Sequence, residues 1–200
     1  MKVAALGRSE ILYNTILKLK EAGHDVCLII TCKEAPDYSI GAEDFKLLAK
    51  KLNVPFLYTD QINSNEVINL IKNSGAEIGV SVNWRTLIGQ EVIDCFRHGI
   101  INAHPGDLPR YRGNAVPNWA ILNGEKEIVL TLHLMSVELD AGPIVLQRKM
   151  PISDRTYIGE VYDFINKNAP QMFVEVVKLF ENNSVKIRLQ PNNPALSLRC

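Results

Sequence analysis

Short apolar runs alternate with amphipathic stretches along the first half of the chain. Leu12, Ile16 and Leu19 recur at spacings of four and three residues, which is the stripe of an amphipathic helix. The run 26–31 is almost wholly apolar, as expected of a strand that is buried on both faces of a sheet. The same alternation predicts strands at 3–6, 26–31, 55–58, 78–82 and 99–103, with helices near 43–52, 66–73 and 90–96.

This succession of elements predicts an α/β fold with a Rossmann-like, open and mostly parallel sheet that is covered by helices on both faces. Strands joined through a helix run in the same direction, so their carboxyl ends meet at one edge of the sheet. Ligands bind in the crevice beyond that edge. The residues that directly follow each strand are therefore the candidates for chemistry.

The pattern changes after residue 104. Pro and Gly residues recur through 104–113 and predict a loop. Pro170 lies inside a helical pattern and predicts a kink or a restart of that helix. We expect one catalytic domain over 1–182 and a loop-like tail over 183–200. The other elements expected in this half are a helix at 118–122, strands at 128–135 and 143–150 around a turn at 140–142, and a helix at 157–180.

Composition and charge narrow the classes of function. Hydrophobic residues make up 46% and charged residues 22% of the chain, which excludes a disordered protein. Lys plus Arg and Asp plus Glu each number 22, so the chain lacks the basic excess of a general nucleic-acid binder. No apolar run reaches the roughly 18–20 residues that span a bilayer. We therefore expect no membrane partner. The four cysteines lack metal-ligand spacing, so we also expect no metal, no disulfide and a cytoplasmic location.

The densest polar cluster begins at the end of the strand predicted at 99–103. Asn102 and His104 are two residues apart, so an extended backbone points both side chains to the same face. An amide and an imidazole side by side can donate two hydrogen bonds to the oxyanion of an acyl-transfer intermediate, and His104 can exchange a proton near neutral pH. Asp140, in the later turn, supplies a carboxylate to orient this histidine. The alternative is that Asn102 and His104 cap a strand and that Asp140 only forms a turn.

Other polar positions have less specific patterns. The run Gly7-Arg8-Ser9 follows the first strand and matches neither Gly-x-Gly-x-x-Gly nor a P-loop. It forms either an ordinary turn, with Ser9 as a helix N-cap, or a contact for an anionic substrate group at the helix N-terminus. Arg112 either binds a phosphate group or is an exposed, solvated side chain. We expect His133 to be a structural histidine, with its hydrogen bonds satisfied, that lies outside the cluster. Trp84 is either a packing residue or a platform for a ligand.

The polar cluster as a whole resembles a known family. The motif Asn-x-His-Pro-x-x-Leu-Pro-x-Tyr-Arg-Gly over 102–113, followed by Asp-x-Gly at 140–142, is similar to the signature of formyltransferases that use 10-formyltetrahydrofolate. The resemblance covers roughly residues 1–180. It implies the formyltransferase fold, 10-formyltetrahydrofolate as the formyl donor, and a catalytic triad of Asn102, His104 and Asp140. It also implies a folate site in two loops, at Thr86, Leu87 and Ile88 and at Ser136, Val137, Glu138 and Leu139.

Within the family, the chain looks most like the domain that formylates a UDP-linked 4-amino-4-deoxyarabinose. This implies that the partner is a small-molecule amine, on an amino sugar nucleotide, and that Gly7, Arg8, Ser9, Arg112 and Asn114 are the weaker candidates for binding it. The chain departs from the pattern in two places. Asn114 stands where close sugar-nucleotide relatives carry Arg, and Gly106 stands where the family usually has Ser.

Several alternatives stay open from the sequence. Within the family, they are a methionyl-tRNA formyltransferase and a glycinamide ribonucleotide formyltransferase. Outside it, they are a formyl-folate hydrolase and a catalytically inactive folate- or nucleotide-binding protein. For Leu87 and Ile88 the alternative is ordinary core packing. A homodimer is one candidate assembly.

Overall fold

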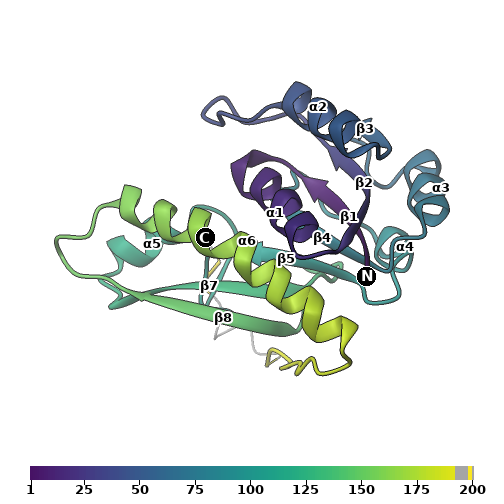
Figure 1. Ribbon diagram of the computed structural model, residues 1–200. Helices are drawn as coiled ribbons and strands as arrows, with labels where there is room; N and C mark the ends of the chain where they lie inside the picture. Colours follow the sequence, from purple (N-terminus) through teal and green to yellow (C-terminus); the bar gives the residue numbers. More distant parts are fainter. Residues whose placement is uncertain (192–197, 200) are drawn as a thin grey trace.

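The computed structural model describes residues 1–191 and 198–199 (Figure 1). Its main sheet contains β1 (Lys2–Gly7), β2 (Asp25–Thr31), β3 (Phe56–Tyr58), β4 (Ile78–Val82), β5 (Ile100–His104), β7 (Glu127–Leu134) and β8 (Ile144–Pro151). The helices are α1 (Ser9–Glu21), α2 (Ala42–Leu52), α3 (Asn65–Ser74), α4 (Gln90–Ile93), α5 (Val116–Leu122) and α6 (Ile158–Glu181).

The seven strands lie in the order β3-β2-β1-β4-β5-β7-β8. The five strands from β3 to β5 in this order are mutually parallel, and β7 runs antiparallel to both of its neighbours. The prediction of a mostly parallel sheet is thus confirmed. The sequence order reverses between β1 and β4, and an open sheet binds its ligand at the carboxyl ends of the strands near such a reversal.

Helices cover both faces of the sheet, because its inner strands are apolar on both sides. In β1, Val3 and Ala5 join one buried cluster, with residues of α1, α2, α5 and α6. Ala4 and Leu6 alternate with them and join a second buried cluster, with residues of α3 and α4. The nearly continuous apolar runs in β1 and β2 follow from this double burial.

Three expected elements differ from the structure. Helix α6 continues through Pro170 as one uninterrupted helix, so of the two expected outcomes, a kink or a restart, the restart was wrong. Its buried face, which includes Met172, Phe173 and Pro170 itself, packs into the core and compensates for the backbone hydrogen bond that proline removes. Helix α4 ends at Ile93, earlier than expected. The loop after β5 contains a short strand, β6 (Tyr111–Arg112).

The tail expected to be loop-like is partly paired with the rest of the fold. Arg188 forms an antiparallel bridge with Ile144 at the start of β8. The short strand β9 (Leu198–Arg199) runs parallel to β6. Residues 192–197 and Cys200 belong to the same expected tail and lie outside the described residues.

The carboxyl ends of β1 and β4 lie very close together. A Cβ atom on Gly7 would lie 2.0 Å from the carbonyl oxygen of Val82, and Gly7 has a φ of +136°. Only glycine fits this position without moving the backbone. The backbone N–H of Arg8 then donates to the same Val82 oxygen at 3.0 Å, which ties the first turn to the end of β4. Among the described residues, no helix is long and apolar enough to cross a membrane.

Candidate active site

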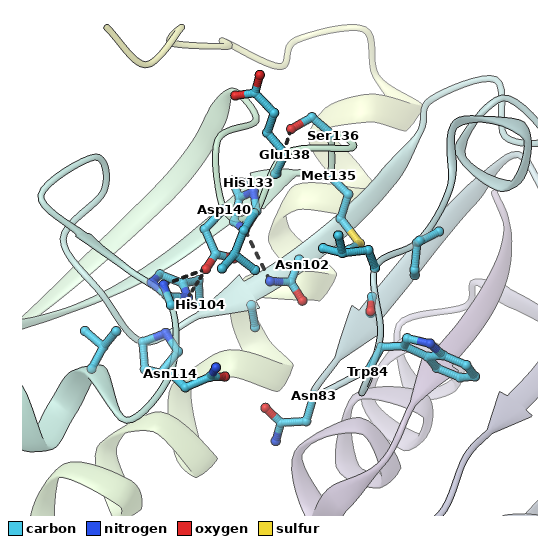
Figure 2. A pocket seen from close by; sticks show the side chains of 18 of the residues that line it. Asn83, Trp84, Asn102, His104, Asn114, His133, Met135, Ser136, Glu138 and Asp140 are labelled. Carbon is cyan, nitrogen blue, oxygen red and sulfur yellow. Dashed lines mark hydrogen bonds and ion pairs between the residues drawn. The ribbon is translucent and has the colours of Figure 1, made fainter. Parts of the chain in front are cut away.

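A cleft that is partly open to solvent lies beyond the carboxyl ends of β4 and β5 (Figure 2). Its walls come from the loop after β4, from β5, from the turn before α5, and from β7 with the loop that follows it. The expected site residues that line it are Asn102, His104, Asp140, Thr86, Leu87, Ile88, Ser136, Glu138, Leu139 and Asn114.

The three residues of the expected triad meet in this cleft, because β5 carries Asn102 and His104 and the loop after β7 carries Asp140. His104 Nδ1 lies 3.5 Å from Asp140 Oδ2. Nearby, the Asn102 side chain projects into the same cleft, two residues before His104 on β5 (Figure 2). The spacing argument from the sequence and the position of the turn therefore bring an amide, an imidazole and a carboxylate to one place.

The contacts of His104 determine which ring nitrogen carries the proton. Its Nε2 lies 2.7 Å from the backbone oxygen of Tyr111, and a carbonyl oxygen can only accept. Nε2 therefore donates, and in the neutral ring Nδ1 holds the lone pair beside Asp140. Burial lowers the pKa of His104 below its ordinary value, although the Asp140 carboxylate acts in the opposite direction. The resting ring is neutral, with Nδ1 as its basic atom.

Asp140 is held as a carboxylate. Burial by itself raises the pKa of Asp140, but the surroundings of the carboxylate, including the N–H of Gly113, outweigh burial and hold that pKa below its ordinary value. The Gly113 N–H donates to Oδ2 at 3.0 Å. The backbone of Asp140 has a φ of 49°, in the left-handed region that few side chains adopt. This conformation is part of what aims the carboxylate at His104.

His133 was expected to stand apart from the polar cluster, and that expectation was wrong. The antiparallel register of β5 and β7 places it directly opposite Asn102. Its Nε2 lies 3.2 Å from Asn102 Nδ2 and 3.6 Å from Asp140 Oδ1. Its Nδ1 lies 2.9 Å from the oxygen of Leu134, so Nδ1 donates and Nε2 is free to accept from the Asn102 amide. No periodicity along the chain reveals this contact, because it depends on strand register.

The loop after β4 forms the wall expected to hold folate. Leu87 is 60% exposed and Ile88 is 2% exposed, so Leu87 offers an apolar surface to the cleft while Ile88 also belongs to the core. Trp84 lines the cleft as well, and its Nε1 donates to Thr86 at 3.1 Å. The side chain of Asn63 holds the loop by two hydrogen bonds: it donates to the backbone oxygen of Leu87 and accepts from the N–H of Gly89.

Other expected binding residues do not line this cleft: they are Gly7, Arg8, Ser9, Arg112 and Val137. The Arg8 guanidinium donates to the backbone oxygens of Asn83 and Lys33 at 2.9 and 2.8 Å, so it ties loops together. Ser9 is not the N-cap of α1, because Arg8 occupies that position and the Ser9 hydroxyl meets the side chain of Asn83. Arg112 donates to Gln190.

The structure gives a reason for Gly106. A Cβ atom on this residue would lie 2.5 Å from His104 Nε2 and 2.6 Å from the oxygen of Tyr111. Any side chain here would press on the hydrogen bond that sets the His104 tautomer. Glycine at position 106 therefore leaves room for the hydrogen bond between His104 and Tyr111. Within the described residues, no group of three or more His, Cys, Asp or Glu side chains is arranged to hold a metal ion.

The sequence is similar to those of known formyltransferases. The methionyl-tRNA formyltransferase of Alkaliphilus oremlandii is 28% identical over 188 residues, which is 92% of this chain and 61% of the relative. The chain thus spans about three fifths of the length of such curated relatives.

Two solved structures share the fold. A glycinamide ribonucleotide transformylase from Symbiobacterium toebii superposes with a TM-score of 0.77 at 20% identity, covering 96% of this chain and 94% of that one. The sugar 3N-formyl transferase WlaRD has a TM-score of 0.71 at 24% identity, covering 100% and 69%. The sequence model described as formyl transferase matches residues 1–177, and the chain therefore belongs to the formyl transferase family.

Proposed function

We propose that this chain transfers the formyl group of 10-formyltetrahydrofolate to a primary amine. The observation that carries the proposal is the meeting of Asn102, His104 and Asp140 in one cleft, with His104 Nδ1 3.5 Å from the Asp140 carboxylate. Family membership supports the reaction class. The crystal structure of WlaRD was determined in the presence of 5-N-formyl-THF, which supports a folate donor here.

The chain's own residues suit each stage of such a transfer. The amine nitrogen attacks the formyl carbon, and the carbonyl electrons move onto oxygen. Asn102 has a second amide N–H that His133 does not engage, and it donates to that oxyanion. His104 Nδ1 takes the proton that the amine loses, and Asp140 stabilises the resulting imidazolium. The electrons then return to carbon, the bond to the folate nitrogen breaks, and His104 returns a proton to that nitrogen.

The charge of the cleft limits the kind of acceptor. Among its lining residues, the side chains with formal charge are the carboxylates Glu138 and Asp140, and none is Lys or Arg. An amine is compatible with this lining, whereas a phosphate beside the reacting nitrogen is not. We propose an acceptor whose amine is several bonds away from its phosphates, as in an amino sugar nucleotide. The sugar 3N-formyl transferase among the solved structures supports this choice.

A methionyl-tRNA acceptor is the second candidate, and the observation that favours it is the sequence similarity to methionyl-tRNA formyltransferases. Its amine is also far from the nearest phosphate. The two candidates differ in what must bind outside the cleft, a short diphosphate in one case and an RNA stem in the other.

One experiment separates these candidates. The protein is incubated with 10-formyltetrahydrofolate and, in parallel, with amino sugar nucleotides, methionyl-tRNA and glycinamide ribonucleotide, and each product is analysed by mass spectrometry. We expect one formyl group on an amino sugar nucleotide. Formate released without any amine would indicate a hydrolase. Folate binding with neither product would indicate an inactive binding protein and would overturn the proposal.

A further inference from the structure

The chain after α6 returns to the active site. Beyond Glu181 it runs back to the sheet, where Arg188 and Ile144 exchange two backbone hydrogen bonds of 2.8 and 2.9 Å. This pairing brings Gln190 to the loop that carries Asp140. The segment 186–190 therefore lies beside a catalytic loop, although it is 46 to 50 residues away from Asp140 in the sequence.

The side-chain amide of Gln190 has four hydrogen-bond contacts. Its Nε2 donates to the backbone oxygens of Asp140 and Gly142, at 2.9 and 2.6 Å. Its Oε1 accepts from Arg112 Nη2 at 2.8 Å and from Arg112 Nε at 3.3 Å. Two carbonyls can only accept and a guanidinium can only donate, so these partners allow a single orientation of the amide. All of the hydrogen-bonding capacity of Gln190 is used in this one place.

The two segments that Gln190 joins are the ones that hold His104 and Asp140. Arg112 directly follows Tyr111, whose backbone oxygen accepts from His104 Nε2. Gly113, the next residue, donates its N–H to Asp140 Oδ2. On the other side, Gln190 binds the backbone oxygen of Asp140 itself, at the residue with a φ of 49°. The amide thus connects the support of the histidine to the support of the carboxylate.

We propose that Gln190 is a positioning residue that keeps the Asp140 carboxylate against His104 Nδ1. The inference rests on the proposed function, because it concerns the efficiency of the same proton transfer. A residue in the left-handed region relaxes readily when the hydrogen bonds that hold it are removed. Loss of the amide therefore frees the Asp140 backbone and lengthens the contact with His104. Gln190 touches no reacting atom and acts only through Asp140.

The test is Gln190→Met, which keeps the length of the side chain and removes its donors and its acceptor. We expect kcat to fall by about 10-fold to 10²-fold, since a displacement of about 1 Å at a catalytic group has an effect of that size. KM for 10-formyltetrahydrofolate changes much less than kcat, because the folate loop after β4 is not touched and the second folate loop, at 136–139, adjoins the freed backbone only at its end. The matched control is Leu189→Ala, the neighbouring residue, whose side chain is 77% exposed. This control keeps wild-type kcat.

A double-mutant cycle distinguishes positioning from a general effect on the fold. If Gln190 acts through Asp140, then Gln190→Met lowers kcat by no more than about twofold when Asp140→Asn is already present. Equal losses in both backgrounds, or an unchanged kcat in the single variant, would overturn the inference. Gln190→Ala is the second variant, used in the same cycle if Gln190→Met does not fold.

A measurement without substrate separates this inference from the proposed function. NMR of the protein with labelled histidine follows the titration of His104 in the four proteins of the same cycle. We expect Asp140→Asn to change the pKa of His104 less when Gln190→Met is present than when Gln190 is intact. An equal change would overturn the positioning role, even if no formyl acceptor is ever found. A wild-type protein that transfers no formyl group would instead refute the proposed function.

Discussion

The Nδ2 atom of Asn102 lies 3.2 Å from Nε2 of His133, which faces it from the neighbouring antiparallel strand. Because the other ring nitrogen of His133 donates to the oxygen of Leu134, the ring presents a lone pair to the amide. This lone pair selects the NH₂ end of Asn102 and turns its Oδ1 away. The proposed oxyanion donor is therefore oriented by a residue that has no part in the proposed proton transfer.

The first prediction concerns this orientation. His133→Phe keeps an aromatic ring of similar size but removes the acceptor, so the Asn102 amide rotates freely. We expect kcat to fall by up to about 10²-fold, because a donor must be preorganised toward the oxyanion to contribute fully. The KM for the folate donor changes little. Steady-state kinetics of His133→Phe, with Asn102→Ala and the double variant, checks the prediction.

Asn102→Ala removes the donor itself and should lower kcat by about 10²–10³. This loss is the largest that His133→Phe can cause by acting through Asn102. In the double variant, His133→Phe should add almost nothing to that loss. Independent, multiplying losses would show that His133 acts by another route. His98→Phe is the control, because His98 does not line the cleft.

The second prediction concerns His104. His104→Ala removes the base, and positioned proton transfer is worth about 10²–10⁴ in rate. The folate wall is formed by other residues, so donor binding stays near that of the wild type. Single-turnover assays and a separate binding titration with 10-formyltetrahydrofolate measure the two quantities. Near-native turnover with the natural amine would remove His104 from the mechanism.

The third prediction distinguishes a charge partner from a turn former at Asp140. Asn serves a turn as well as Asp does, so Asp140→Asn keeps the fold and loses only the stability that the charge contributes, but it has no negative charge to stabilise the imidazolium. We expect kcat to fall by orders of magnitude. The pKa of His104 is already lowered by burial, and without the carboxylate it falls further. The acidic limb of the pH–rate profile therefore moves to lower pH.

Stability gives a second check on Asp140. Its pKa lies below the ordinary value in the folded state, so its contribution is present above the unfolded pKa and is lost as pH falls through the folded one. The difference in unfolding free energy between wild type and Asp140→Asn should stay constant near neutral pH and shrink in acid. If Asp140→Asn had normal turnover and an unshifted pH–rate profile, Asp140 would be only a turn residue.

The fourth prediction concerns Gly106. A Cβ atom there would approach both His104 Nε2 and the oxygen of Tyr111 closer than 3.0 Å, so Gly106→Ala displaces the ring or the carbonyl. We expect a loss of kcat of about 10-fold or more, since the tautomer of His104 is no longer fixed. The control is Gly159→Ala, because a Cβ on Gly159 meets nothing within 4 Å. Kinetics and circular dichroism of both variants are compared. Equal activity in the two would refute the steric argument.

The sequence predicted well the features that depend on local periodicity. The strands around Val3, Val26 and Ile78 lie within two residues of their expected bounds, because runs buried on both faces are apolar throughout. The common face of Asn102 and His104 follows from their spacing of two residues in a strand. The helix around Pro170 was predicted with a kink or a restart, and the restart does not occur, because the stability of α6 comes from packing of its whole apolar face and not from local propensity.

The sequence could not predict the features that depend on strand register or on the path of the tail. His133 faces Asn102 only because β7 runs antiparallel to β5 in one register. Gln190 reaches Asp140 only because Arg188 pairs with Ile144. Both contacts join residues more than thirty positions apart, and a shift of the register by one residue would remove either of them.

The antiparallel pairing of β5 with β7 has a consequence for the entropy of binding in the proposed reaction. Asn102, His133 and His104 lie on two strands that are paired with each other and have a further strand on either side, and not on free loops. The conformational entropy of arranging these side chains is therefore lost when the protein folds, before any donor arrives. For the proposed transfer, the binding of a donor therefore adds little ordering cost for these three side chains.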